Sequence, residues 1–225
     1  MQPAQDNDSQ AALVATNTSR VRQGALLANV TIAGIVLYVI IDVIAQALPP
    51  HYNPISQAES DLAVGPYGFL MTINFVLRGL VALTMLGALS REVAKQGLSR
   101  VGLVLVGIWG IGAFLLALFP TDVGASTTLH GKIHLLVALI AFVCAPVGEL
   151  LLSLRLAADE RWRALRKPAL VISTLAIVAL VLDLLVPFVR RMQDAFGLFE
   201  RLFIGMVLLW MLVVAIRLRS RPASK

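Results

Sequence analysis

Two histidines stand four residues apart in the segment LHGKIH, and their spacing suggests chemistry more directly than any other pair in this chain. Residues four apart on a helix share one face, with Cβ atoms about 6 Å apart. His130 and His134 could therefore bind one metal ion, and zinc with Asp122 as a third ligand is the site that this pattern predicts. The zinc-protease motif has Glu directly after its first histidine, where this chain has Gly131.

Two alternatives to this ligand set stay open. Glu59, Asp61 or His51 could supply the third ligand instead of Asp122. The two histidines could also be structural, because amphipathic rings are common at the level of the lipid head groups, where they hydrogen-bond neighbouring loops.

A long polar loop, HYNPISQAESDLAVGPYG at residues 51–68, supplies further candidates. Ser60 and Asp61 in this loop, together with Asp122, are the candidate catalytic residues. Loops of this length often carry function, and a short helix here could cover the mouth of a helical bundle. The alternative is a well-capped linker.

Polar residues also lie inside long apolar stretches, where an unpaired charge is costly and must find a partner. We predict that Asp42, Asn74, Arg78 and Asp183 form the floor of a pocket. Their depths predict an ion pair between Arg78 and either Asp42 or Asp183, with either a ligand-binding or a purely structural role. A fourth ionisable residue, Glu149, is expected to reach the lipid surface or Arg155.

Six apolar stretches must position these residues. Of the 225 residues, 58% are hydrophobic and only 14% are charged, whereas a soluble domain has about 25% charged residues. Each stretch has the length of about 20 residues that crosses a bilayer as a helix. The sequence therefore predicts an all-α, polytopic bundle of six transmembrane helices, at residues 21–48, 67–89, 101–119, 129–156, 169–189 and 196–216.

The distribution of basic residues predicts the orientation of the bundle. Of the 19 Lys and Arg residues, 14 flank the start of the first span, the second and fourth links, and the C-terminus. We expect the protein to lie in the plasma membrane. Because loops rich in basic residues stay on the cytoplasmic side of a membrane, both termini are expected in the cytoplasm. The net charge of +6 then reflects contact with anionic membrane lipid, and no nucleic-acid partner is expected.

The domain organisation follows from the same pattern. Residues 1–20 are polar and are expected to form a disordered cytoplasmic tail, residues 21–216 a single membrane domain, and residues 217–225 a basic cytoplasmic tail. The single cysteine, Cys144, excludes an internal disulfide.

Three segments resemble the "domain of unknown function 998" family of six-span prokaryotic membrane proteins. They are YNPISQAESDLAVGPYGFLMTINFVLRGL, FPTDVGASTTLHGKIHLLVALIAF and GLFERLFIGMVLLWML, and the resemblance covers residues 28–216. It implies the six-span topology and adds no reaction. The positions that match the family pattern are Tyr52, Pro54, Ser60, Asp61, Arg78, Asp122, His130, His134, Glu200 and Arg201.

Three functional hypotheses remain open from the sequence. The first is a metal-assisted hydrolase or lipid-modifying enzyme that acts at the outer leaflet. The second is a small-solute binding or transport protein, and the third is a non-catalytic membrane partner of another protein. The working site that the sequence favours is an outward pocket between the first, second, fourth and fifth spans.

Overall fold

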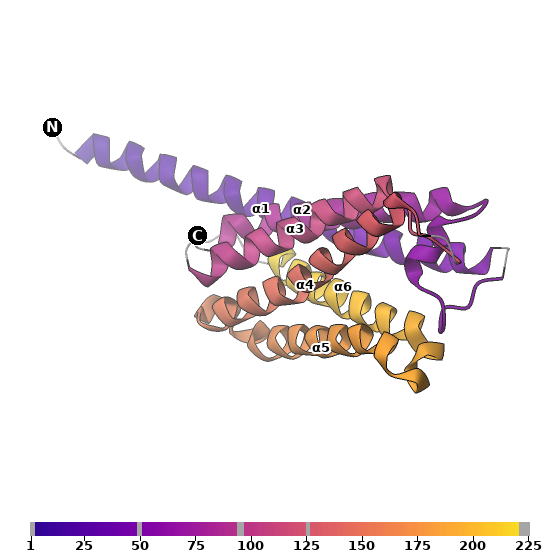
Figure 1. Cartoon of the computed structure of the whole chain (residues 1–225). Helices are drawn as coiled ribbons and strands as arrows, with labels where there is room; N and C mark the ends of the chain where they lie inside the picture. The colour runs from indigo at the N-terminus through magenta and orange to yellow at the C-terminus, as the bar shows by residue number, and fades with distance from the viewer. Residues whose placement is uncertain (1–2, 49–50, 94–96, 125–126, 221–225) are drawn as a thin grey trace.

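The computed structural model describes residues 3–48, 51–93, 97–124 and 127–220. These residues form six long helices and no strand (Figure 1). All six helices are long and apolar enough to cross a membrane, which confirms the predicted fold class. The helices are α1 (Pro3–Ala47), α2 (Gly68–Glu92), α3 (Leu98–Leu118), α4 (Leu129–Ala157), α5 (Arg166–Leu185) and α6 (Phe196–Arg219).

Helix α1 includes residues 3–20. The sequence-based expectation for this segment is a disordered tail, so the structure differs from it here. The membrane-crossing part of α1 is Thr18–Ala47. No Gly or Pro interrupts the chain between Pro3 and Gly24, and Pro suits the first position of a helix. Because extending a formed helix is much easier than nucleating one, the apolar span can propagate through this polar segment. At the other terminus, α6 takes in residues 217–219, and residues 221–225 lie outside the described part of the chain.

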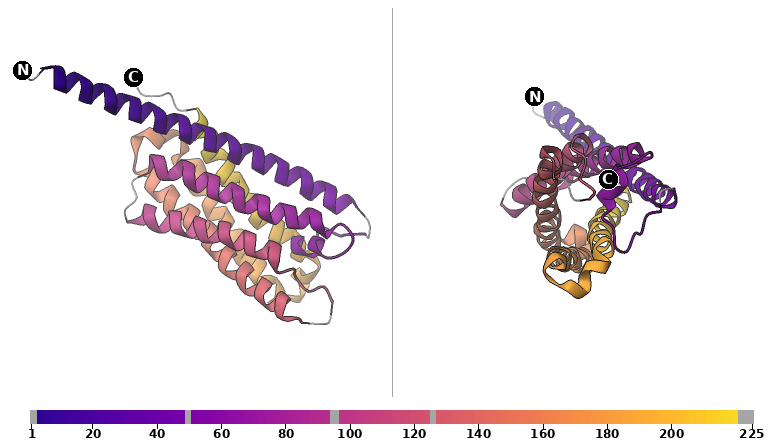
Figure 2. Two further views of the ribbon diagram at one scale, coloured as in Figure 1. Left: turned by 90° about the horizontal axis from the view of Figure 1, so that it is seen from above. Right: turned by 45° about the vertical axis from the view of Figure 1, so that its right-hand side comes forward.

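The helices are arranged as a ring (Figure 2). Each helix packs against the helix before it and the helix after it, and α1 packs against α6 to close the ring. Close approach between neighbours depends on small residues: a Cβ atom added at Gly102 of α3 would lie 2.8 Å from a Leu152 side-chain carbon and 2.9 Å from the Gly148 carbonyl oxygen of α4. This is the packing expected of membrane helices, where small residues let backbones approach.

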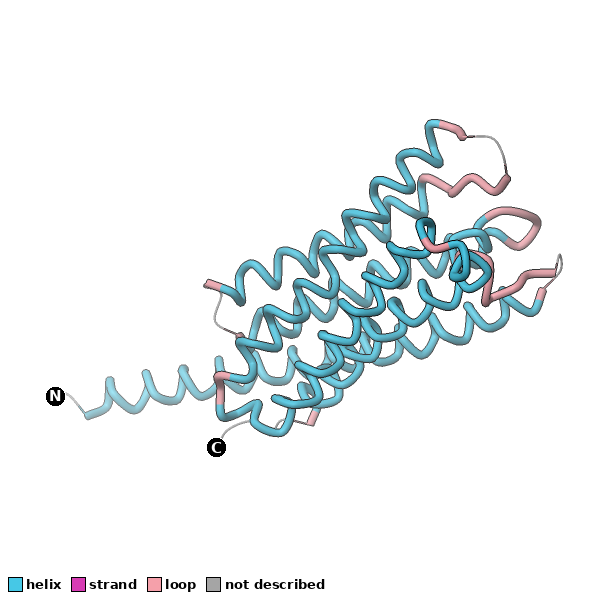
Figure 3. The backbone as a smooth tube through the Cα atoms, turned by 60° about the horizontal axis from the view of Figure 1, so that its bottom comes forward, coloured by secondary structure: helices cyan, strands magenta, loops and turns pink. Residues whose placement is uncertain are grey.

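The two ends of the ring differ in their loops. The N-terminal part of α1 projects beyond the bundle at the end where α6 finishes (Figure 3). At the opposite end lie the α1–α2 loop with a short 3-10 turn, η1 (Glu59–Ala63), and the α3–α4 and α5–α6 links, the last of which contains η3 (Val186–Phe188) and η4 (Arg190–Ala195). Several buried polar residues, among them Glu59, Arg78, His134 and Glu200, lie at this loop-rich end.

Candidate functional site

A buried ion pair links the α1–α2 loop to the interior of the ring. Arg78 of α2 is 2% exposed, and its Nη1 atom lies 3.7 Å from Oε2 of Glu59, which is 3% exposed. The structure thereby corrects the predicted partner of Arg78, which was Asp42 or Asp183. The reason is that the α1–α2 loop folds into the bundle as η1 and places the Glu59 carboxylate beside Arg78. The prediction compared only how deep residues lie along the helices, so it could not include a residue of a loop.

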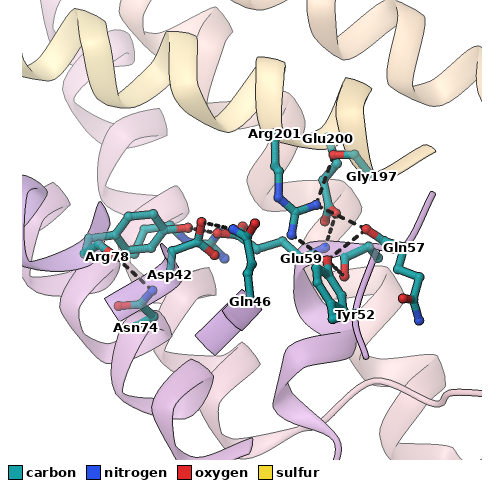
Figure 4. Close-up of polar contacts among 12 residues, drawn as sticks. Asp42, Gln46, Tyr52, Gln57, Glu59, Asn74, Arg78, Gly197, Glu200 and Arg201 are labelled. Atoms are coloured by element: carbon teal, nitrogen blue, oxygen red, sulfur yellow. Dashed lines mark hydrogen bonds and ion pairs between the residues drawn. The ribbon is translucent and has the colours of Figure 1, made fainter. Parts of the chain in front are cut away.

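Further polar contacts hold this ion pair in place (Figure 4). The hydroxyl of Tyr38 in α1 donates a hydrogen bond to Oε1 of Glu59. The side-chain amide of Asn74 donates to the backbone carbonyl of Tyr38 at 3.1 Å. The Arg78 guanidinium also lies 5.1 Å from the centre of the Phe75 ring, a cation–π distance. Helices α1 and α2 and the loop therefore meet at one buried charge pair.

The same loop is docked onto the first turns of α6. The Glu59 backbone N–H donates to Oε2 of Glu200 at 2.5 Å. The Arg201 guanidinium donates to the backbone carbonyls of Pro54 and Gln57, each at 3.1 Å, and to the hydroxyl of Tyr52. Glu200 and Arg201 stand out in the sequence through the family pattern and as two charges in the first turns of an otherwise apolar span. Neither signal predicts that they contact the α1–α2 loop.

Tyr52 completes the docking contact between the loop and α6. Its ring lies under the Arg201 guanidinium, 5.2 Å from ring centre to Cζ, and its hydroxyl donates to the Ala58 carbonyl at 2.6 Å. Burial raises the pKa of the Tyr52 hydroxyl well above its ordinary value, so it stays a neutral donor at physiological pH.

Gly197 in the first turn of α6 leaves the space that this docking needs. A Cβ atom added at Gly197 would lie 2.0 Å from the Gln57 carbonyl oxygen and 2.7 Å from that of Pro54. One residue further on, the Leu198 backbone N–H donates to the Ile55 carbonyl at 2.9 Å. Backbone therefore packs directly against backbone at this contact.

The structure gives Asp122, predicted as a metal ligand or catalytic residue, a capping role. Its carboxylate accepts hydrogen bonds from the Thr128 backbone N–H at 2.7 Å and the Thr128 hydroxyl at 2.8 Å, and these bonds lower the pKa of Asp122. Thr128 in turn caps α4 by accepting from the Gly131 N–H. A Cβ atom at Gly131 would lie 2.0 Å from Oδ2 of Asp122, so glycine follows His130 because the carboxylate occupies that space.

The two histidines have separate surroundings. His134 is buried, and its Nδ1 lies 2.7 Å from the Phe119 carbonyl oxygen. Since a carbonyl only accepts, Nδ1 carries the proton and Nε2 is the remaining acceptor of a neutral ring. His130 is exposed and packs on the Phe119 ring, with 5.6 Å between ring centres. Within the described ranges, no three His, Cys, Asp or Glu side chains come together as a set that could hold a metal ion.

A cavity of about 540 Å³ lies beside the ion pair, within the range of about 300–1,000 Å³ typical of ligand pockets. The predicted residues Ser60, Asp61, Arg78, Asp122, His134 and Asp183 all line it. Its other lining residues are Ala58, Glu59, Phe75, Leu116, Thr121, Leu135, Ala138, Leu139, Phe142, Leu184, Pro187, Phe188, Phe196 and Glu200. The structure therefore brings many of the predicted site residues together. The cavity differs from the predicted pocket because, among the described residues, α3 and α6 contribute to its lining and α1 does not.

Two predicted pocket residues lie elsewhere. Asp42 accepts a hydrogen bond from Gln46 one turn further along α1, and none of the described residues that line the cavity belongs to α1. Asn74 supports the backbone of α1 and is not among the lining residues.

Asp61, in contrast, lines the cavity. Burial raises the pKa of its carboxyl group above the ordinary value, so the side chain is a weaker acid than a free aspartate.

Glu149 also departs from its prediction. It is fully buried in α4, and both carboxylate oxygens lack a hydrogen-bond partner among the described residues. The expectation that Glu149 reaches the lipid surface or Arg155 is wrong, because its side chain points into the ring.

Comparison with known proteins adds the family. A family model described as "Protein of unknown function (DUF998)" matches residues 32–217. The matched region includes the docked loop, the ion pair, the cap of α4 and the first turns of α6. No curated protein and no solved structure matches the chain.

Replacement of Gly197 by Ala tests the docking of the loop onto α6. The added methyl group would overlap two backbone carbonyl oxygens, so we expect the free energy of unfolding to fall by about 1–3 kcal/mol. Gly205→Ala in the same helix is the matched control, because nothing lies within 4 Å of a Cβ atom there. Thermal unfolding of both purified variants in detergent is the measurement. Equal stability of the two variants would contradict the docking contact.

Proposed function

The chain belongs to the DUF998 family, whose function is unknown, and from that premise we propose that it binds an amphipathic, lipid-like molecule. The binding site is the cavity at the loop-rich end, which is lined by helices α2 to α6 and by the loops at that end. One observation carries this proposal: the cavity has a polar floor and apolar walls that continue onto the lipid-facing surface. An amphipathic molecule has this same division.

The walls of the cavity are apolar where they meet the surface of the bundle. Leu135 and Leu139 of α4 are 63% and 48% exposed, and Phe188 in the α5–α6 link is 84% exposed. In a bilayer, these side chains contact lipid tails. A ligand can therefore keep its tail in the bilayer while its polar head enters between the helices.

The floor of the cavity is polar and buried. It carries Glu59 with its partner Arg78, His134, Asp183 and Glu200. Burying these groups next to lipid tails is costly unless they are paired or hydrogen-bonded. A polar head group supplies hydrogen-bond partners there, whereas a small hydrophilic solute would leave the apolar walls uncovered. We therefore rank lipid binding above solute transport and above a non-catalytic partner role.

A lipid-modifying enzyme is the second candidate function, and His134 is the observation that favours it. Its Nδ1 contact with the Phe119 carbonyl holds the ring, which leaves Nε2 as a base on a residue that lines the cavity. Ser60 and Asp61 line the same cavity and would be the nucleophile and an acid or base. A zinc-assisted form of this chemistry has less support, because the Asp122 carboxylate is held by Thr128 and no three possible ligands come together among the described residues.

The proposed orientation puts the cavity in the outer leaflet of the plasma membrane and both termini in the cytoplasm. The support is the concentration of Lys and Arg at the end of the bundle where α6 finishes.

Filling the cavity tests ligand binding. Ala138→Trp on α4 places an indole within the lining, and Val143→Trp, on an exposed position of the same helix outside the lining, is the matched control. Native mass spectrometry of the purified protein should find a bound amphiphile in the wild type and in Val143→Trp, and none in Ala138→Trp. Equal occupancy in all three proteins would overturn the proposal, as would a wild type without a bound amphiphile. Leu135→Trp at the mouth is a second variant in case the first does not fold.

Reporter fusions test the orientation. A fluorescent protein that matures only in the cytoplasm should be bright when fused after Lys225, and a periplasmic phosphatase fused there should be inactive. The opposite pair of results would reverse the proposed orientation. Insertion of the same two reporters into the loop at Val64 should give the reciprocal pattern.

A further inference from the structure

We propose that the cavity binds the ammonium group of an aliphatic amine, with Asp183 as its counter-ion. This inference rests on the proposed function and names the chemistry of the head group. Its basis is an excess of carboxylates on the cavity lining, one of which is buried without a partner.

The charges on the lining do not balance. The carboxylates are Glu59, Asp61, Asp122, Asp183 and Glu200, and the cationic or potentially cationic side chains are Arg78 and His134. The single permanent positive charge is already engaged, because the Arg78 guanidinium pairs with Glu59. The remaining acidic groups lie on the loops, α5 and α6, and two of them already have partners: Asp122 accepts from Thr128, and Glu200 accepts from the Glu59 backbone N–H.

Asp183 distinguishes this arrangement from a simple acidic cluster. It is 5% exposed, and its buried Oδ1 atom has no hydrogen-bond partner among the described residues. Buried polar atoms in folded proteins are nearly always hydrogen-bonded. A donor that carries positive charge would satisfy the free oxygen and neutralise the buried carboxylate.

The ligand chemistry follows from these two requirements. A primary ammonium carries three N–H donors and one positive charge, so it fits an unpartnered carboxylate oxygen. A quaternary ammonium has the charge without a donor, and an alcohol has a donor without the charge. The described residues offer no three-ligand set for a metal ion, so we infer an organic cation. The apolar walls at Leu135, Leu139 and Phe142 then accommodate an aliphatic chain.

Binding of matched amphiphiles tests this inference. Purified protein in phosphatidylcholine nanodiscs would be titrated with dodecylamine, dodecyltrimethylammonium and dodecanol, and binding measured by calorimetry. We expect wild-type protein to bind dodecylamine at least about tenfold more tightly than either analogue. Asp183→Asn, which preserves size, should weaken dodecylamine binding by at least about tenfold. Asp194→Asn removes an exposed acid of the same end of the bundle, outside the lining, and should leave binding unchanged.

The outcomes separate this inference from the proposed function. If the three amphiphiles bind alike and all are lost in Ala138→Trp, the cavity binds amphiphiles and the ammonium site is wrong. If none binds, the proposed function fails as well. Dodecylamine binding that is unaffected by Asp183→Asn overturns the role of Asp183.

The source of the amine is distinguished by competition. Nanodiscs in which phosphatidylethanolamine replaces part of the phosphatidylcholine should weaken dodecylamine binding if the ammonium belongs to a lipid head group. Unchanged binding would assign the site to a free alkylamine. Either result supports an ammonium site, provided that Asp183→Asn weakens the dodecylamine binding itself.

Discussion

The structure depends on the requirement that the buried charge of Arg78 be neutralised inside the membrane. An arginine that is 2% exposed has little contact with solvent, and leaving such a charge unpaired in the interior is strongly unfavourable. The carboxylate that pairs with it comes from Glu59 in the α1–α2 loop. The loop must therefore fold into the end of the ring, and its backbone polar groups must find partners once they leave water.

The first turns of α6 supply those partners. Glu200 accepts from the N–H of Glu59, and Arg201 donates to loop carbonyls. The pair of charges that looks out of place at the start of an apolar span thus compensates for the loop that enters the bundle. The inserted loop also forms one side of the cavity, since Glu59, Ser60 and Asp61 line it. The element that neutralises Arg78 therefore helps to build the proposed binding site.

Sequence analysis predicted the six helices well because the length and hydropathy of a membrane span are local properties. It missed the helical state of residues 3–20, because polar composition was taken to mean disorder although no helix-breaking residue is present. It identified Arg78 as buried and charged, but not its partner. Burial depth can be estimated for residues on helices and not for a loop that turns back into the bundle.

The segment between Asp122 and His134 carries a prediction that residue spacing alone does not decide. Histidines four apart on a helix are compatible with a metal site and equally with a capped helix start. The contacts of Asp122 with Thr128 and of His134 with Phe119 depend on the path of a loop that spacing does not reveal. Conversely, Asp183 and Asp61 were singled out by type and position, and both line the cavity.

A double-mutant cycle on Glu59 and Arg78 tests the central claim most directly. Glu59→Gln and Arg78→Gln would each leave one buried charge unpaired, so each should lower the free energy of unfolding by about 3–5 kcal/mol. The double variant removes both charges and should be more stable than the sum of the two losses predicts, by at least about 1 kcal/mol. Strictly additive losses in the double variant would contradict the account, because they would mean that the two side chains do not interact.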